Sequence, residues 1–257
     1  MKTVSFIGSG RITRIFIEGL TRKNSLPDQV RIFDTNPESA ANIKSAFPSV
    51  IVSESAEQAA ESSSLVIIAV HPPAFTETAS KISRVLSGEE TILSLVPKFT
   101  IDKIAEAFPK NRNTARMNPN APSIINEGFN PVSYSYGFNK EDKAILIKFL
   151  SVLGETPEVP DGQIEAFAVI TAMGYTYLDY QFNEIFTAAK EFGIDPNTAA
   201  KAVVKLAEGC AKTVINNQEA QYNSMDLVPV RPMADIEEAM KTAYRSKLSE
   251  RYKMLTN

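Results

Sequence analysis

Cysteine and histidine are almost absent from this chain of 257 residues, which contains one of each, Cys210 and His71. A single cysteine excludes an intramolecular disulfide and a metal site built on cysteines. A single histidine effectively excludes a zinc site built from clustered His and Cys ligands. It also excludes a Ser-His-Asp catalytic triad, unless His71 serves it. We therefore expect a functional site without a metal.

Long apolar runs and a strong charge of one sign are also lacking. No run approaches the ~20 apolar residues of a membrane-spanning helix, and the N-terminus enters a strand pattern without signal-peptide architecture. The formal net charge of -3 gives no reason to expect a nucleic-acid or membrane partner. Together with the single cysteine, these features predict a cytoplasmic protein whose partner is a small molecule.

Apolar strand patterns alternate with amphipathic helix patterns in the first 150 residues. The expected strands cover residues 3–7, 30–33, 50–52, 65–70, 91–96, 113–117 and, as an edge strand, 132–136. The first expected helix follows the glycines at positions 8 and 10, and further helices are expected over residues 37–46, 73–85 and 100–107. This alternation predicts an α/β fold with right-handed crossovers, namely a Rossmann-type doubly wound parallel sheet.

The pattern changes after residue 154, where a segment with two prolines, residues 154–160, is typical of a hinge. Helices are expected over residues 163–192, from the N-cap Asp195 to residue 216, and over 233–255. We therefore predict a dinucleotide-binding domain over residues 1–156 and an all-α domain over 157–257. The first of these helices is apolar on more than one face, which predicts a homodimer or higher homo-oligomer through the helical domain.

A glycine motif follows the first strand and opens the first helix, which is the context of a dinucleotide-binding fingerprint. Gly8 permits a tight turn, and Gly10 lets the backbone approach a pyrophosphate. The N–H groups at the start of the helix and the helix dipole favour an anion. The motif assigns five residues to the cofactor: Gly8, Ser9, Gly10, Arg11 and Ile12. The third glycine position is Thr13, which predicts looser packing between helix and strand.

Asp34 ends the second strand at the spacing of the acidic residue that hydrogen-bonds the adenine ribose. A carboxylate at this place accepts hydrogen bonds from the ribose hydroxyls and repels a 2′-phosphate, so Asp34 favours NADH over NADPH. Two alternatives stay open. Asp34 caps the turn before Asn36 and Pro37 in one, and Arg11 reaches a 2′-phosphate in the other.

Several blocks of the chain, taken in order, resemble the pyrroline-5-carboxylate reductase family. Residues 6–10 are similar to its opening, and Ala69-Val70-His71-Pro72-Pro73 stands where the family has Ala-Val-Lys-Pro-Gln. Residues 116–122, Arg-Met-Asn-Pro-Asn-Ala-Pro, resemble its Arg-x-Met-Pro-Asn-Thr-Pro block, and the segment around Gly174 lines up with its Gly-Ser-Gly-Pro-Ala-Tyr signature. The resemblance covers nearly the whole chain and supports a helical dimerisation domain.

The resemblance also implies further site residues. It adds Ala69, Val70, His71, Asn118 and Asn120 to the cofactor site, where the Asn120 amide is suited to orient a nicotinamide or ribose. Thr171, Thr176 and His71 become the candidate catalytic residues, the two threonines on the helix that faces the cleft. His71 donates a hydrogen bond, acts as a general acid, or is a loop histidine without such a role.

Two other charged residues have competing interpretations. Arg116 pairs with a ligand anion or, as we slightly favour, ties the end of the sheet to the loop 118–122. The family's Ser-Pro-Gly-Gly-Thr-Thr segment, which contributes to substrate carboxylate binding, is replaced over residues 227–235, and its second signature serine is Met173. Arg231 in that segment either binds a substrate carboxylate or, as we favour, is a surface residue.

The resemblance implies an NAD(P)H-dependent oxidoreductase that transfers a hydride to the C=N carbon of a cyclic imino acid, giving proline. Reduction of a protonated imine needs no strong protein acid, so the protein's tasks are to position the nicotinamide and hold the substrate. The altered substrate motifs keep two alternatives open. One is a related NAD-dependent dehydrogenase of another small acid, with His71 as proton donor, and the other is a cofactor-binding protein without turnover.

Overall fold

The computed structural model describes residues 1–216 and 224–256 and divides into two compact units. The first unit runs from Met1 to Met173 and includes the end of the chain from Arg251, and the second runs from Gly174 to Glu250. The first unit extends past the predicted boundary at residue 156. Asp161 and Glu165 account for this extension, because both form ion pairs with Arg116 of the sheet.

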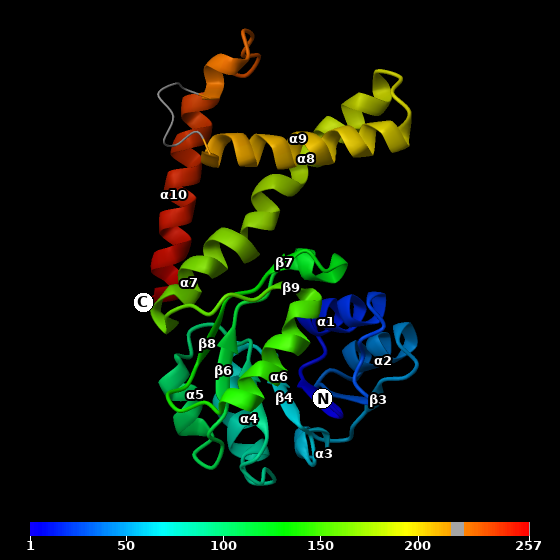
Figure 1. The fold of residues 1–257 in the computed structure, drawn as a ribbon, viewed down its shortest axis with the longest axis vertical. Helices are drawn as coiled ribbons and strands as arrows, with labels where there is room; N and C mark the ends of the chain where they lie inside the picture. Colours follow the sequence, from blue (N-terminus) through cyan, green and yellow to red (C-terminus); the bar gives the residue numbers. More distant parts are fainter. Residues whose placement is uncertain (217–223, 257) are drawn as a thin grey trace. The chain divides into compact units, whose positions relative to one another are not determined.

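A seven-stranded sheet forms the centre of the first unit (Figure 1). Its strand order is β3-β2-β1-β4-β5-β6-β8, and every pair is parallel except β6 and β8. The strands are β1 (Thr3–Ile7), β2 (Gln29–Phe33), β3 (Ile51–Val52), β4 (Leu65–Ile68), β5 (Thr91–Ser94), β6 (Thr114–Met117) and β8 (Val132–Tyr134). This order confirms the predicted Rossmann-type sheet, including β8 as its edge strand.

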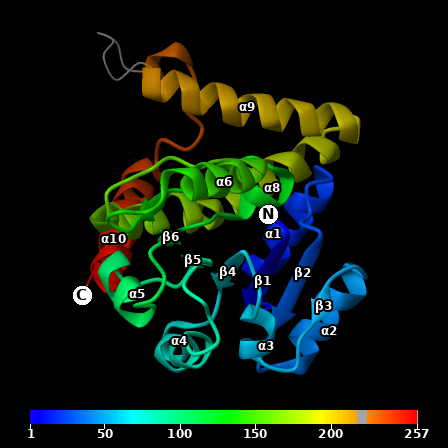
Figure 2. The same cartoon turned by 60° about the horizontal axis from the view of Figure 1, so that its bottom comes forward.

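Helices cover both faces of this sheet because its central strands are apolar on both sides. Val4 and Phe6 of β1 pack in one core with residues of α1 (Arg11–Arg22), α2 (Pro37–Ala46) and α6 (Lys140–Leu150). Ile7 and the alternate residues of β4 pack in a second core with α3 (Ala56–Ala60), α4 (Phe75–Ile82) and α5 (Ile101–Ala107). Figure 2 shows this second group of helices below the strands.

Polar side chains cap several of these helices. Asn36 accepts a hydrogen bond from the N–H of Glu38 at the start of α2, and Thr100 accepts one from Lys103 in α5. Asn139 caps α6 and Ser55 caps the short α3. Neither helix was predicted from the sequence. In both of these helices a cap and a few apolar positions suffice, because the sheet supplies the rest of the packing.

The predicted hinge over residues 154–160 is bound to the first unit. Its β9 (Gly154–Glu155) pairs with β7 (Gly128–Phe129) in a small parallel sheet. The N–H of Val159 donates to the carbonyl oxygen of Val132 in β8 at 2.9 Å. These backbone hydrogen bonds hold the segment along the edge of the main sheet.

The helix expected over residues 163–192 is divided. It consists of α7 (Ile164–Phe167), a π-helical turn η5 (Ala168–Ala172) and α8 (Gly174–Glu191), and along the chain the first compact unit ends at Met173. A π turn inserts an extra residue into the helical ladder and is often found at functional sites.

The second unit is helical, as predicted, in its described residues. Besides α8 it contains α9 (Pro196–Asn216) and most of α10 (Glu237–Thr256). Asp195 is the predicted N-cap and accepts a hydrogen bond from the N–H of Thr198 at 3.0 Å. The Tyr244 hydroxyl of α10 donates to the carbonyl oxygen of Tyr177 in α8, which holds the two helices together. Among the described helices, none is long and apolar enough to cross a membrane.

Candidate dinucleotide site

The Gly8 turn connects β1 to α1 and is fixed by its backbone. Gly8 has φ +108°, and a Cβ atom there would lie 2.4 Å from the carbonyl oxygen of Ala69. The N–H of Gly8 donates to the carbonyl oxygen of Phe33 at 2.7 Å. The turn therefore lies close to the ends of β2 and β4, and only glycine fits at its first position.

Thr13 secures the same turn from inside the helix. Its side chain is fully buried, and its hydroxyl donates to the carbonyl oxygen of Gly8 at 2.6 Å. The departure from the usual third glycine thus adds a hydrogen bond between helix and turn. From the sequence we expected only looser packing at Thr13, without this hydrogen bond.

Gly10 is the N-cap of α1 and leaves an opening in front of the helix. A Cβ atom at Gly10 would meet no heavy atom within 4 Å, and Gly10 has no side chain that could cap the helix. The first turn of α1 contains no acidic residue. Free N–H groups, the positive end of the helix dipole and an open approach together suit a phosphate group.

Asp34 faces the glycine turn from the end of β2. Its Oδ2 accepts hydrogen bonds from the N–H of Ser9 at 2.6 Å and from the Ser9 hydroxyl at 3.0 Å. Its Oδ1 accepts from the N–H of Asn36 at 2.8 Å, which is the turn-capping role of one predicted alternative. The carboxylate therefore links the two turns at the ends of β1 and β2.

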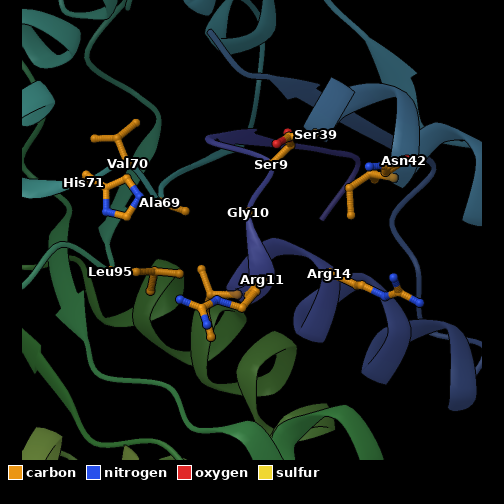
Figure 3. Close-up of a pocket in the computed structure, with 12 residues that line it drawn as sticks. Ser9, Gly10, Arg11, Arg14, Ser39, Asn42, Ala69, Val70, His71 and Leu95 are labelled. Carbon is orange, nitrogen blue, oxygen red and sulfur yellow. The ribbon is translucent and has the colours of Figure 1, made fainter. Parts of the chain in front are cut away.

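A cavity of about 520 Å³ opens in front of the Gly8 turn (Figure 3). Seven of the predicted cofactor residues line it: Ser9, Gly10, Arg11, Ile12, Ala69, Val70 and His71. The cavity lies at the carboxyl ends of β1 and β4, where the strand order reverses and ligands bind in doubly wound sheets. Two other predicted cofactor residues, Gly8 and Asp34, are not among the residues that line this cavity.

Five further lining residues were not predicted: Arg14, Ser39, Asn42, Ile43 and Leu95. Arg14 lies one helical turn after Arg11 on α1, and Ser39 and Asn42 lie one turn apart on α2. Helical spacing from Arg11 is the signal that would have found Arg14. In Figure 3, Arg14 and Asn42 lie on one side of the cavity, His71 and Leu95 lie on the other, and Ser39 is drawn next to Ser9 between them.

Asn118 and Asn120 lie outside this lining. Asn120 is buried, and its side-chain oxygen accepts from the N–H of Phe129 at 3.2 Å, so this oxygen stabilises its own loop. Its Nδ2 is 3.5 Å from the carbonyl oxygen of Thr171. The Nδ2 atom of Asn118 is buried without a hydrogen-bond partner among the described residues. Their predicted contact with the cofactor stays a prediction.

Arg116 is structural, but its partners differ from those we predicted. Its side chain is only 2% exposed and pairs with Asp161 at 3.1 Å and with Glu165. It therefore ties β6 to the segment that begins α7, and not to the loop 118–122. Two carboxylates surround one guanidinium, and Arg116 is the most buried charged side chain among the described ion pairs.

The candidate catalytic residues are spread over both units. His71 is exposed and lines the cavity. Thr171 lies in η5, where its hydroxyl donates to the carbonyl oxygen of Phe167 at 2.9 Å, and Thr176 lies on α8. The roles of the two threonines stay predictions. Arg231 forms an ion pair with Glu237, which supports its interpretation as a surface residue. The described residues contain no group of His, Cys, Asp and Glu that could hold a metal ion.

Comparison with known proteins adds a sequence relationship to this geometry. Residues 3–98 match the family described as NADP oxidoreductase coenzyme F420-dependent. The pyrroline-5-carboxylate reductase of Escherichia coli (strain K12) is 25% identical over 229 residues, which cover 88% of this chain and 84% of that protein. The enzyme of the same name from Corynebacterium melassecola is 24% identical, over 82% and 79% of the two chains.

Solved structures share the fold. The pyrroline carboxylate reductase of Plasmodium falciparum, solved with NADP bound, has a TM-score of 0.75 at 16% identity, over 99% of this chain and 95% of that one. The prephenate dehydrogenase of A. aeolicus, solved with NAD+, has a TM-score of 0.56 at 14% identity, over 97% and 98%.

The glycine turn, the cavity at the strand ends and the sequence match define a class, the NAD(P)-dependent reductases with a Rossmann-type domain. Within this class, the chain is similar over most of its length to the pyrroline-5-carboxylate reductases of Escherichia coli and Corynebacterium melassecola.

Proposed function

We propose that this protein reduces the C=N bond of a cyclic imino acid with NAD(P)H and forms proline. The composition of the cavity carries this proposal. His71 is the only histidine among the residues that line this cavity, and none of them is Asp, Glu, Lys, Tyr or Cys. An imine that is already protonated accepts a hydride without a protein acid, so such a site suits it.

The chain's own residues have positioning tasks in this reaction. The N–H groups at the start of α1 bind the pyrophosphate, and Gly10 lets it approach the backbone. Arg11 lines the middle of the cavity and adds a positive charge there. Ala69, Val70 and His71 line the cavity at the end of β4, and these residues would hold the nicotinamide ring. NAD(P)H supplies the hydride when it is bound.

The experiment that tests this function supplies Δ1-pyrroline-5-carboxylate with NADH or NADPH and measures proline. Formation of proline in proportion to the enzyme is the expected result. Its absence at high enzyme concentration would reject the substrate. Oxidation of NAD(P)H by 2-oxo acids would then indicate the related dehydrogenase, and cofactor binding without any turnover would indicate a binding protein.

A variant of His71 distinguishes reduction of an imine from reduction of a carbonyl substrate. We expect His71→Gln to lower kcat less than about tenfold if the substrate is an imine, since glutamine still donates a hydrogen bond. A carbonyl substrate needs a proton, and general acid catalysis contributes roughly 10²–10⁴-fold. The measurement is the pH profile of kcat for each substrate that the protein turns over. A loss beyond about 100-fold would contradict imine chemistry.

The second candidate function, reduction of another small acid, is favoured by the altered substrate motifs. Met173 replaces a serine of the family signature, and Arg231 is the cation of the segment that replaces the Gly-Gly-Thr-Thr residues. Because Arg231 is held by Glu237, its guanidinium is already paired in this structure. A substrate panel of imino acids and 2-oxo acids decides between the two candidates.

We further propose that the protein forms a homodimer through its helical unit and functions in the cytoplasm. Apolar side chains of α9 and of the segment before α10 are exposed, among them Leu206, Ile215 and Val230 at 53%, 64% and 67%. Exposed apolar area of this kind marks an interface between proteins. Sedimentation equilibrium is expected to give twice the mass of the 28.2 kDa chain, and a single monomeric species would reject the dimer.

A further inference from the structure

The loop after β6 contacts the π turn η5 through one side chain. Asn120 is buried, and its Nδ2 atom lies 3.5 Å from the carbonyl oxygen of Thr171 in η5, a long hydrogen bond. The two residues are 51 positions apart in the chain, and both belong to the first compact unit. This contact joins a loop at the carboxyl edge of the sheet to the turn that carries a candidate catalytic residue.

The side chain of Asn120 is itself held by its own loop. Its Oδ1 accepts from the N–H of Phe129 at 3.2 Å, and its backbone N–H donates to Oδ1 of Asn130 at 3.1 Å. The buried Ser123 hydroxyl lies 3.4 Å from the Asn120 Oδ1 and 2.9 Å from the Asn130 Oδ1. These bonds fix the plane of the amide group, so its Nδ2 atom is directed at Thr171 before any ligand binds.

A second path connects the same loop to the same turn. The rings of Phe129 and Phe167 lie with their centroids 6.0 Å apart, a distance at which aromatic side chains attract each other. The Thr171 hydroxyl donates to the carbonyl oxygen of Phe167 at 2.9 Å. The contacts thus form a closed path from Asn120 through Phe129 and Phe167 to Thr171 and back. Thr171 cannot move away from the loop without breaking contacts on both sides of this path.

The π turn needs such an external hold more than an α-helix does. Its own hydrogen bond runs from the N–H of Met173 to the carbonyl oxygen of Ala168 at 2.9 Å, one residue further than in an α-helix. The π form is rare, and the α-helical ladder is its alternative. A shift of the ladder by one residue rotates side chains about the helix axis by about 100°. A contact to the carbonyl of Thr171 therefore helps to set where its side chain points.

The hydroxyl of Thr171 is left as a hydrogen-bond acceptor. Its proton is bound to the carbonyl oxygen of Phe167, so the lone pairs of the oxygen remain for another donor. Thr171 is only partly buried, which leaves access for a small molecule. The N–H of a protonated cyclic imine is such a donor, whereas a carbonyl substrate has none at its reacting oxygen. This state of Thr171 suits an imine.

We propose that Asn120 is a positioning residue, which holds the carbonyl of Thr171 and thereby fixes the Thr171 hydroxyl oxygen as the acceptor for the N–H of the substrate. This inference rests on the proposed reduction of a cyclic imino acid. It gives the Asn120 amide a task other than the contact with the nicotinamide or ribose that was predicted for it. Asn120 acts on the substrate through Thr171 and does not touch it.

Asn120→Asp and Ser123→Ala form a matched pair of variants. The first keeps an oxygen for the N–H of Phe129 but places a second oxygen against the carbonyl of Thr171, which it repels. We expect it to lower kcat/KM for Δ1-pyrroline-5-carboxylate about tenfold, with the calorimetric Kd of NAD(P)H changed less than about twofold. Ser123→Ala removes hydrogen bonds from the same buried loop and spares the contact to Thr171, so kcat/KM should change less than about twofold.

Two results of this comparison would overturn the inference. Equal losses of kcat/KM in the two variants would mean that any damage to the loop has the same effect. A loss of NAD(P)H affinity in Asn120→Asp as large as its loss of kcat/KM would instead restore the predicted contact with the cofactor. Thermal unfolding checks that each variant is folded. Asn120→Ser, which is too short to hold the Thr171 carbonyl, replaces Asn120→Asp if that variant does not fold, with the same expectations.

A double-mutant cycle tests whether Asn120 acts through the Thr171 hydroxyl. Thr171→Val removes this hydroxyl and keeps the backbone carbonyl and the branched side chain. In this background Asn120→Asp should lower kcat/KM less than about twofold further, because the oxygen that Asn120 positions is gone. A further loss of about tenfold, as in the parent, would show that the two residues act independently and would overturn the inference.

Hydrogen exchange of the peptide over residues 168–173 gives a readout that needs no turnover. We expect exchange there to be about tenfold faster in Asn120→Asp and unchanged in Ser123→Ala, because the N–H of Met173 is protected by the π turn. Faster exchange without proline formation by the parent would reject the substrate and support the hold of Asn120 on the turn. Proline formation with unchanged exchange and kcat/KM in Asn120→Asp would support the function and overturn the inference.

Discussion

Replacement of Gly8 by alanine is expected to lower the free energy of unfolding by about 3 kcal/mol or more. An L-residue at φ +108° is strained by roughly 1–3 kcal/mol, and the new methyl group would lie 2.4 Å from the backbone oxygen of Ala69. That oxygen belongs to the loop after β4 and cannot move without displacing the strand. Urea denaturation, followed by circular dichroism, measures the change.

Gly10→Ala is the matched variant, because the same methyl group there meets no heavy atom within 4 Å. The free energy of unfolding should fall by less than about 1 kcal/mol, since alanine is only a somewhat poorer N-cap than glycine. The affinity for NAD(P)H should fall at least about tenfold, because the methyl group projects into the opening where the pyrophosphate approaches. Calorimetric titration measures this loss.

The two glycines are thus expected to separate stability from binding. Gly8 is needed by the fold, and Gly10 by the ligand. If Gly8→Ala is as stable as the parent, the positive φ and the contact with Ala69 are not needed by the folded chain. If Gly10→Ala binds NAD(P)H normally, the cofactor does not approach α1 as proposed.

Arg116→Met is expected to cost about 3–5 kcal/mol of unfolding free energy. Methionine has a similar length and is apolar, so the change mainly removes the charge that Asp161 and Glu165 share. Loss of one partner from a buried ion pair leaves an uncompensated charge, which is why the cost is large. The side chains of Asp161 and Glu165 are 23% and 11% exposed, so water relieves part of it.

The triple variant Arg116→Met, Asp161→Asn, Glu165→Gln is the control for this prediction. It removes all three charges, and we expect it to recover a large part of the lost stability, since an apolar or neutral replacement of a buried ion cluster is often well tolerated. Denaturation in urea measures both variants. A stable Arg116→Met with weakened NAD(P)H binding would instead support the alternative that Arg116 pairs with a ligand anion.

The alternation of strands and helices was predictable because burial on both faces leaves a direct signal. β1 and β4 are short apolar runs, and each is followed by a turn and an amphipathic helix. α6 lacked such a signal, because its first four residues, Lys140 to Lys143, are all charged. The sheet decides that its apolar positions, among them Leu146 and Leu150, face inward.

The site was predictable where the backbone carries the function and less so where side chains converge. Glycines between a strand and a helix indicate a phosphate site through their conformation. Arg14 and Asn42 are ordinary polar residues of helices in the sequence, and only the packing of α1 beside α2 brings them to one cavity. The sequence also assigned Asn120 to the cofactor by type, whereas most of its hydrogen bonds stabilise its own loop.

The sequence by itself determined the Rossmann-type sheet, the Gly8 turn and the helical second part, because each depends on local conformation or on periodic burial. The tertiary structure decided the partners of Arg116, which lie 45 and 49 residues further along the chain. It also decided that Asp34 binds Ser9, 25 residues away. Contacts between distant residues follow from how the strands and helices pack, and the order of residues in the chain does not contain that information in readable form.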